Sequence, residues 1–401
     1  MIARLFPAAL RGEVTTPPSK SDAQRLLIAA WLAGDIDRVQ LNGAQSADIA
    51  ACVRCLHALS NPEPCLDCGD SGAVLRFLTP VAAALGGARM TGSHQLAARP
   101  MGALLHALAE NGCRVSGGSL PFAVSGGLRG GVYALPGDVS SQFISGLLFA
   151  LPLLGQDSQI RLTSPLRSAG YVDMTRDVLR RFGVRSMRTE DGFSVPGGQT
   201  YRPCAYTVEG DYSQAAFLAV LGAARGGVAV TGLREDSLQG DRAILDILAR
   251  CGARIIRTDD AALFEKSDLR GTEIDLADCP DLGPVLMVLG ALCKGETVIR
   301  NAARLRMKES DRIAAMEQEL RKMGAELFST QDTVTVRGGA LHGADGLYGH
   351  NDHRVVMALA VAAYAAGVPA AIGGAEAINK SWPDFFETVR ALGGKVELTD
   401  E

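Results

Sequence analysis

Aromatic residues and long apolar runs are scarce in this chain of 401 residues. Phe, Trp and Tyr together make up only 5% of the sequence, so the core must be mainly aliphatic. The longest apolar run, near Val355 to Ala366, is too short to cross a bilayer and instead predicts a buried helix. We therefore expect no interaction with a membrane.

Positive charge is not in excess either. The formal net charge is −4 and the isoelectric point is about 5.9, with no basic stripe or tail. A nucleic-acid surface needs such a cluster, so we expect no nucleic-acid partner. The N-terminal segment 1–14 has a short apolar part broken by Pro7 and Gly12, which does not match a signal peptide. These features together predict a cytoplasmic protein.

The nine cysteines are scattered, which is typical of free thiols in a reducing compartment. Two CxxC pairs, Cys52/Cys55 and Cys65/Cys68, nevertheless offer a ligand set that zinc accepts. The first pair lies in a predicted amphipathic helix, and the nine-residue spacer between the pairs is short for a zinc ribbon. Incidental thiols are the favoured interpretation, with zinc as the alternative, and we expect no metal.

What the chain does have is an internal repeat. Six segments each open on a turn with a small polar or acidic residue, continue as a smooth apolar helix and close on glycine: 17–34, 68–87, 136–155, 209–227, 279–295 and 350–367. A helix that is apolar nearly all round must be buried. A second, amphipathic helix accompanies each one, usually ending in glycine: 47–59, 102–115, 172–184, 242–255, 313–327 and 385–396.

The repeat predicts six copies of a strand–helix–strand–helix–strand unit, arranged as two domains of three copies each. One acidic residue recurs at the start of the apolar helices, and its position predicts a helix N-cap. Its occurrences are Asp70, Asp138, Asp211, Asp281 and Asp352. Helix N-termini that point toward one place also create positive potential, which favours an anion there.

Basic side chains gather near the starts of both kinds of helix, where they oppose the helix dipole. They are Lys20, Arg25, Arg76, Arg99, Lys308, Arg312, Arg354 and Lys380. Small polar residues that can bind phosphate and hydroxyl groups accompany them: Ser21, Ser140, Ser141, Gln142 and Ser168. The chain has no GxxxxGK[ST] motif and no GxGxxG after a strand, which argues against a nucleotide triphosphate or dinucleotide. The pattern predicts small, strongly anionic substrates held between two domains.

The motifs PPSKS, VSSQF, KESDR, NDHR and NKSWPDFF together resemble those of the 5-enolpyruvylshikimate-3-phosphate synthases, over nearly the whole chain. The resemblance implies an α/β fold of two similar domains, each with three βαβαββ repeats around buried helices (an inside-out α/β barrel). It places the N-terminal domain at 15–208 and the C-terminal domain at 1–14 plus 209–401, with the active site in the cleft between them.

The family transfers the enolpyruvyl group of phosphoenolpyruvate to the 5-hydroxyl of shikimate 3-phosphate and releases phosphate, on the shikimate pathway to chorismate and the aromatic amino acids. The resemblance implies catalytic roles for Asp281, Glu309, Lys20 and Lys308. It assigns contacts to shikimate 3-phosphate to Lys20, Ser21, Arg25, Ser140, Ser141, Gln142, Ser168, Tyr171, Asp281 and Lys308. It assigns contacts to phosphoenolpyruvate to Lys20, Gly72, Arg76, Arg99, Gln142, Arg312, Arg354 and Lys380.

The reaction explains why two acids lie among so many cations. Asp281 is expected to take the proton of the 5-hydroxyl, while Glu309, with Lys20, serves the methylene carbon of phosphoenolpyruvate. The cations offset the charges of the phosphates and carboxylates and orient them. We expect no cofactor and a monomeric enzyme. Because Gly72 has no side chain, we also expect glyphosate to enter the phosphoenolpyruvate site.

Two residues depart from many family members. Asp70 replaces an Asn, so an N-cap role competes with a substrate contact, and Arg304 also stands where some members have Asn. Two other functions remain as alternatives: an enolpyruvyl transferase acting on UDP-N-acetylglucosamine, and a non-catalytic phosphate-binding protein on the same fold. The SSQ and KESDR motifs and the presence of both acids favour the shikimate enzyme.

Overall fold

The computed structural model describes residues 1–400. The chain divides into two compact units, which we call unit 1 (residues 1–19, 43–46 and 209–401) and unit 2 (residues 20–42 and 47–208). β2 (Gly12–Thr15) pairs with β13 (Val228–Thr231), and both strands belong to unit 1. Unit 2 ends at Val208, and unit 1 resumes at Glu209.

Five four-stranded sheets share one pattern, in which one outer pair of strands is parallel and the other two pairs are antiparallel. Two belong to unit 2: β4 (Cys65–Asp67), β5 (Gly87–Thr91), β7 (Phe122–Ser125) and β6 (Arg114–Ser116); and β8 (Val132–Leu135), β9 (Ser158–Leu162), β11 (Gly192–Val195) and β10 (Met187–Arg188). The first repeat keeps only a parallel pair, β3 (Val39–Gln40) with β12 (Tyr206–Thr207).

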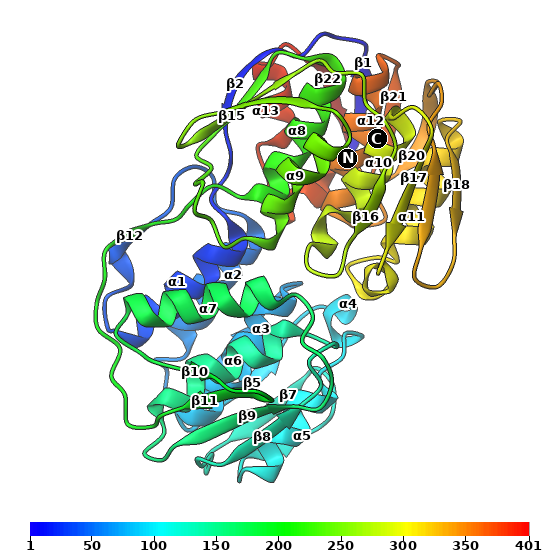
Figure 1. Ribbon diagram of the computed structural model, residues 1–401. Coiled ribbons are helices and arrows are strands. Elements are labelled where there is room, and N and C mark those ends of the chain that lie inside the picture. Colours follow the sequence, from blue (N-terminus) through cyan, green and yellow to red (C-terminus); the bar gives the residue numbers. More distant parts are fainter. Residues whose placement is uncertain (401) are drawn as a thin grey trace. The chain divides into compact units, whose positions relative to one another are not determined.

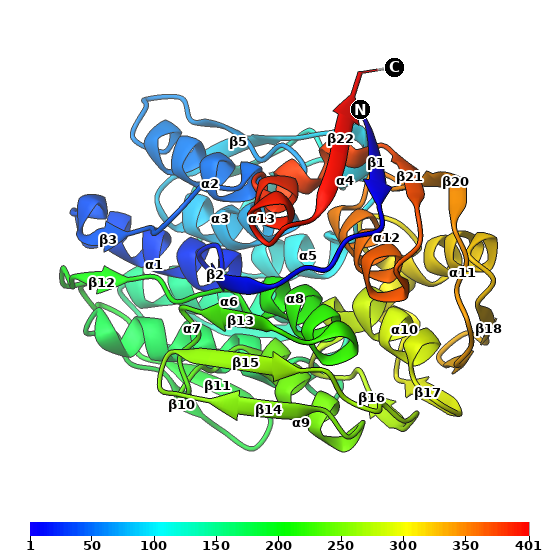
Figure 2. The same cartoon turned by 90° about the horizontal axis from the view of Figure 1, so that it is seen from above.

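Unit 1 contains the other three sheets. They are β2, β13, β15 (Ala261–Glu265) and β14 (Arg254–Arg257); β16 (Glu273–Asp275), β17 (Glu296–Arg300), β19 (Val334–Arg337) and β18 (Glu326–Ser329); and β20 (Ala344–Tyr348), β21 (Ala370–Gly373), β1 (Ile2–Phe6) and β22 (Lys395–Thr399). Figure 2 shows β1 lying between β21 and β22, so the last sheet of the chain is completed by its first strand.

The apolar helices are buried, as the sequence predicts. In unit 1 they are α8 (Tyr212–Arg225), α10 (Gly283–Leu292) and α12 (His353–Ala366), which pack against one another (Figure 1). In unit 2 they are α1 (Lys20–Leu32), α3 (Gly72–Ala84) and α6 (Ser141–Ala150), of which α3 and α6 are in close contact. Each full sheet has one strand more than the sequence pattern predicted; three repeats run βαβαββ along the chain, and the sheets of α8 and α12 take one strand, β2 or β1, from the N-terminal segment.

The amphipathic helices are α2 (Ala47–Ala58), α5 (Gly102–Glu110), α7 (Ala169–Arg181), α9 (Ala243–Arg250), α11 (Arg312–Lys322) and α13 (Phe385–Ala391). The last five are each followed by a glycine with φ between 81° and 92°: Gly112, Gly183, Gly252, Gly324 and Gly393. That left-handed conformation closes a helix C-terminus and disfavours any residue with a β-carbon. One further short helix, α4 (His94–Ala97), precedes α5.

The N-cap prediction is right for two of the recurring acids and wrong for the others. Asp211 caps α8 and Asp352 caps α12 through their side chains. The caps of α3 and α6 are instead Ser71 and Ser140, each adjacent to its helix. Asp281 lies within a 3-10 turn, η4 (Pro280–Leu282), and not at a cap position.

Each unit has its own apolar core, and among the described residues neither core cluster draws a residue from the other unit. No helix within residues 1–400 is long and apolar enough to cross a membrane.

Candidate active site

Unit 1 brings together the charged residues of three separate motifs. Asp281 comes from η4, before α10; Lys308 follows η5 (Ala303–Met307); and Arg354 lies in the first turn of α12. The Asp281 carboxylate lies 3.1 Å from Nζ of Lys308 and 3.3 Å from Nη2 of Arg354. Arg312, the first residue of α11, adds a third cation at 3.0 Å. One carboxylate is therefore shared by three cations.

Glu309 lies beside this group. Its Oε2 accepts a hydrogen bond from Nη2 of Arg312 at 2.6 Å, and its Oε1 lies 3.7 Å from Nζ of Lys380. Lys380 ends η6 (Ala375–Lys380). The six predicted residues of unit 1 thus form one network, which we call the acid–cation cluster: Asp281, Lys308, Glu309, Arg312, Arg354 and Lys380.

Burial and charge act in opposite directions on this cluster. Burial alone would raise the pKa of Asp281, but the charges of Arg354, Lys308 and Arg312 outweigh it and lower that pKa well below its ordinary value. Burial lowers the pKa of Lys308, and the charges of Arg312 and Arg304 add to the lowering, although Asp281 opposes it. Asp281 is consequently ionised at neutral pH and accepts hydrogen bonds only.

The sequence did not identify Asp352 as part of this network. Its side chain is fully buried, and its Oδ2 accepts from Nε of Arg312 at 2.8 Å and from Oγ of Ser310 at 3.1 Å. Its Oδ1 caps α12 through the N–H of Arg354 at 3.0 Å. Asp352 therefore joins Arg312 and Arg354, a role that its position in the repeat does not reveal.

Unit 2 carries a second set of candidate residues around the N-termini of α1, α3 and α6. Lys20, the first residue of α1, forms an ion pair of 3.1 Å with Asp48 of α2, which the sequence also failed to single out. Arg25, one turn into α1, is buried, and that burial lowers its pKa to about 10. Its guanidinium donates to the carbonyl oxygens of Ser21 and Tyr171 and to Oγ1 of Thr175.

Arg76 of α3 and Gln142 of α6 are joined by a hydrogen bond of 2.8 Å between Nη1 and Oε1. Gly72, the first residue of α3, lies so close to this group that an added β-carbon would meet Nη1 of Arg99 at 2.7 Å and Nη1 of Arg76 at 3.4 Å. The absence of a side chain at Gly72 is therefore what makes room for two guanidinium groups. Ser140 and Ser141 start α6, and Ser168, with φ 54°, precedes α7.

Two candidate residues, Asp70 and Arg304, depart from the pattern of many family members. Asp70 accepts a hydrogen bond from Oγ of Ser93 and does not cap α3, so its predicted N-cap role is wrong. Arg304 lies in η5, and a substrate contact for it stays a prediction.

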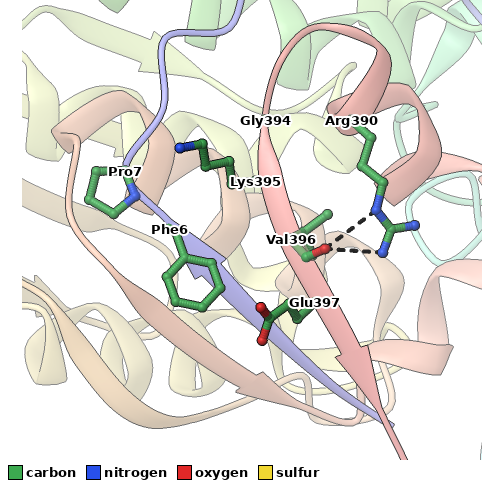
Figure 3. Close-up of a pocket in the computed structure, with 7 residues that line it drawn as sticks. All are labelled: Phe6, Pro7, Arg390, Gly394, Lys395, Val396 and Glu397. Carbon is green, nitrogen blue, oxygen red and sulfur yellow. Dashed lines mark hydrogen bonds between the residues drawn. The ribbon is translucent and has the colours of Figure 1, made fainter.

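Other parts of the structure do not add to the candidate site. The nine cysteines are free, and within residues 1–400 no group of three or more His, Cys, Asp or Glu side chains is arranged to hold a metal. A surface hollow of about 560 Å³ lies in unit 1 between the end of β1 and the α13–β22 segment (Figure 3). None of its lining residues is a candidate: Phe6, Pro7, Arg390, Gly394, Lys395, Val396 and Glu397.

Comparison with known proteins identifies the family of the chain. Residues 58–389 match the family model of EPSP synthase (3-phosphoshikimate 1-carboxyvinyltransferase). A 3-phosphoshikimate 1-carboxyvinyltransferase of Clostridium kluyveri is 40% identical over 98% of this chain and 97% of its own length. One of Halobacterium salinarum is also 40% identical, over 99% of this chain and the whole of that protein.

Solved structures show the same fold. EPSP synthase from Acinetobacter baumannii superposes with a TM-score of 0.82 at 24% identity, and the match covers all of both chains. The enolpyruvyl transferase NikO from Streptomyces tendae has a TM-score of 0.79 at 18% identity, covering 99% of this chain and 98% of that one. With the match to the family model and relatives of 40% identity over nearly its full length, the chain belongs to the EPSP synthase family, the 3-phosphoshikimate 1-carboxyvinyltransferases.

Proposed function

We propose that this chain transfers the enolpyruvyl group of phosphoenolpyruvate to the 5-hydroxyl of shikimate 3-phosphate, with the acid–cation cluster supplying the acid/base groups. The observation that carries the proposal is the carboxylate of Asp281, held ionised by Lys308, Arg312 and Arg354, with Glu309 on the same arginine. Two proton transfers at two places need two such groups.

In the first half of the reaction, the 5-hydroxyl oxygen bonds to C2 of phosphoenolpyruvate while the methylene carbon gains a proton. Asp281 takes the hydroxyl proton, and Glu309 with Lys20 delivers the proton to carbon. In the second half, the new methyl group returns a proton to Glu309 with Lys20, the C–O bond to phosphate breaks with its electron pair leaving on phosphate, and the proton held by Asp281 passes to the departing phosphate. The products are 5-enolpyruvylshikimate 3-phosphate and inorganic phosphate, so atoms and charge balance.

The cations also tune the base. Asp281 is a weak base while three cations surround it, because they lower its pKa. Anionic groups of the substrates draw part of that positive charge toward themselves, and the pKa of Asp281 then rises. The carboxylate therefore becomes a better base when the substrates are bound, which couples proton transfer to substrate binding.

We assign the residues of unit 2 to substrate binding, so that the active site needs residues of both units. Lys20, Ser21, Arg25, Ser140, Ser141, Gln142, Ser168 and Tyr171 would bind shikimate 3-phosphate. Gly72, Arg76, Arg99 and Gln142 would join Lys20, Arg312, Arg354 and Lys380 on phosphoenolpyruvate. The hydrogen bond between Arg76 and Gln142 and the close approach of Gly72 to Arg99 support the second group.

We further propose that the protein acts as a cytoplasmic monomer. All the residues assigned above come from one chain, and none needs a second copy. Light scattering at working concentration tests the monomer, and a dimer with activity confined to the dimer fraction would overturn it.

Phosphate release from phosphoenolpyruvate tests the reaction, with shikimate 3-phosphate and UDP-N-acetylglucosamine offered separately as acceptors. We expect phosphate release when shikimate 3-phosphate is the acceptor and none with UDP-N-acetylglucosamine. Asp281→Asn or Glu309→Gln should each lower kcat by about 10²–10⁴-fold. Asp275→Asn is the matched control, because Asp275 is an exposed carboxylate of unit 1 that accepts hydrogen bonds only from Ala277 and Asn301. Release with the nucleotide sugar only would move the chain to the sister activity.

A further inference from the structure

The chain turns between β20 and α12 through two residues with left-handed backbone conformation. His350 has φ 50° and Asn351 has φ 52°, and the N–H of Asp352 donates to the carbonyl oxygen of Gly349 at 2.8 Å. This is the arrangement of a type I′ turn, which favours Gly, Asn and Asp at both central positions. A histidine adopts this conformation more readily than most residues with a side chain, although less readily than Gly or Asn.

The imidazole of His350 contacts a buried carboxylate. Its Nε2 lies 2.9 Å from Oε1 of Glu319 on α11, and its ring packs edge-on against Tyr348 with a centroid distance of 5.3 Å. The Glu319 side chain is fully buried and also accepts from the backbone N–H of Tyr348 at 3.0 Å and from Nζ of Lys322 at 2.7 Å. Since a carboxylate only accepts hydrogen bonds, all three groups donate to it. We call this set the Glu319 clamp: Glu319, Lys322, Tyr348 and His350.

The clamp and the acid–cation cluster are attached to the same two elements. Arg312 precedes Glu319 by seven residues, or about two helical turns, so both project from one face of α11. Arg312 binds Asp352, which directly follows the turn, while Glu319 binds His350 within the turn. The turn and α11 are thus joined at two points, and one of those points is a contact of the candidate active site.

We propose that Glu319 and His350 are positioning residues for the reaction, an inference that rests on the function proposed above. The clamp fixes the turn relative to α11, and the turn fixes the Asp352 carboxylate that orients Arg312. Arg312 in turn contacts Asp281 at 3.0 Å and Glu309 at 2.6 Å. Glu319 and His350 act only through Asp352 and Arg312. The competing interpretation is an ion pair that serves the stability of α11 alone.

Two substitutions of His350 separate these interpretations because they move stability and activity in opposite directions. His350→Asn suits the left-handed turn position, but its side chain is too short to reach Glu319. His350→Gln disfavours the turn, yet its amide nitrogen can take the place of Nε2 as a donor. We expect His350→Asn to keep its thermal midpoint and lose about tenfold in kcat/KM for phosphoenolpyruvate. We expect His350→Gln to melt earlier and stay closer to wild-type activity.

Glu319→Gln replaces one carboxylate oxygen by an NH₂ group, which cannot accept a hydrogen bond from the donors around it. We expect the same loss of about tenfold in kcat/KM. The double variant Glu319→Gln/His350→Asn should be no worse than the more severe single variant, because both break one contact. Glu317→Gln is the matched control. Glu317 lies on the same helix and also pairs with a cation, Arg321, and a hydroxyl, Ser329, but it contacts neither the turn nor the cluster.

Each outcome of these measurements distinguishes the positioning role from a purely structural one. Activity that follows the thermal midpoint across the His350 variants, or Glu319→Gln and His350→Asn with wild-type kcat/KM, would show that the clamp is only structural. Multiplicative losses in the double variant would show that the two residues do not act through one contact. If the wild type is active and the variants are unaffected, the positioning role of the Glu319 clamp is refuted but the proposed function stands. A wild type that releases no phosphate refutes the proposed function and with it the clamp's part in it.

Discussion

Asp281 illustrates how a single side chain can stay charged where burial opposes charge. Three cations approach its carboxylate at 3.0 to 3.3 Å, and their combined attraction exceeds the cost of burial. One of these cations, Arg312, also contacts Glu309 and Asp352. Removing one carboxylate therefore leaves cations that repel one another, so function and stability depend on the same contacts.

The depressed pKa of Asp281 predicts a pH dependence of stability. The folded pKa is lower than the unfolded value of about 3.9, so the ionised form favours folding. This contribution is fully present above the unfolded pKa and is lost as the pH falls through the lower folded pKa. We expect Asp281→Asn to lower the free energy of unfolding at neutral pH, and this difference from wild type to shrink below about pH 4. Denaturant titrations at several pH values measure it, and a difference that stays constant into strong acid would contradict the assignment.

The close contacts of Gly72 predict that adding a single methyl group there affects the binding of phosphoenolpyruvate. The β-carbon of Gly72→Ala would lie 2.7 Å from Nη1 of Arg99, which must move, and 3.4 Å from Nη1 of Arg76. We expect the KM for phosphoenolpyruvate to rise by about tenfold while the KM for shikimate 3-phosphate changes little. Glyphosate, which we expect to inhibit the wild type, should inhibit the variant less. Gly118→Ala, where an added β-carbon meets nothing within 4 Å, is the control, and equal KM values in both variants would be evidence against a phosphoenolpyruvate role for Arg99.

At the scale of elements, the amphipathic helices follow from local signals. Their apolar stripe and the glycine after them are readable from the sequence, and the structure confirms both for α5, α7, α9, α11 and α13. A glycine with φ near 81°, such as Gly183, is needed there because a β-carbon crowds the backbone in that conformation.

Replacing glycine by alanine should change the free energy of unfolding in opposite directions at a position with positive φ and at one with ordinary φ. Gly183→Ala, after α7, should lower the free energy of unfolding by about 1 kcal/mol because the left-handed conformation disfavours alanine. Gly102→Ala, at the first position of α5, should raise it by about 0.4–1 kcal/mol, since its φ is ordinary and an added β-carbon meets nothing within 4 Å. Denaturant melts of the two variants settle the comparison. Equal effects would mean that backbone conformation does not decide the stability at these positions.

Helix caps and the charged pairs were harder to predict, for a physical reason. Asp70 and Ser71 are both good capping residues, and only the exact start of α3 decides that Ser71 is the cap. Likewise, the KESDR motif indicated a charged site, but the pairing of Arg312 with Asp352 and of Lys20 with Asp48 depends on tertiary contacts. Repeats and motifs therefore predicted the fold and most candidate residues, while the partners that orient them needed the structure.

At the scale of the whole molecule, each unit is stabilised by a core of its own. Leu148 of α6 is fully buried in the core of unit 2, and Leu286 of α10 is fully buried in that of unit 1. The two cores have no described residue in common, so a cavity in one does not remove contacts from the other.

Matched cavities in the two cores should consequently have separate effects. We expect Leu148→Ala to destabilise unit 2 by about 2–5 kcal/mol and Leu286→Ala to destabilise unit 1 by a similar amount. In a calorimetric scan each variant should lower the midpoint of a different transition. A single transition that shifts equally in both variants would mean that the units unfold as one.

The place of β1 has a consequence for how the protein is made. Residues 2–6 are synthesised long before their partners in β21 and β22. Unit 2 has its complete sequence once Val208 has been synthesised, whereas unit 1 needs segments that lie before and after unit 2 in the sequence. During translation the N-terminal strand must therefore remain without its native partners and keep from pairing with others. The unit that holds Asp281 and Arg312 is completed only after β22 has been synthesised.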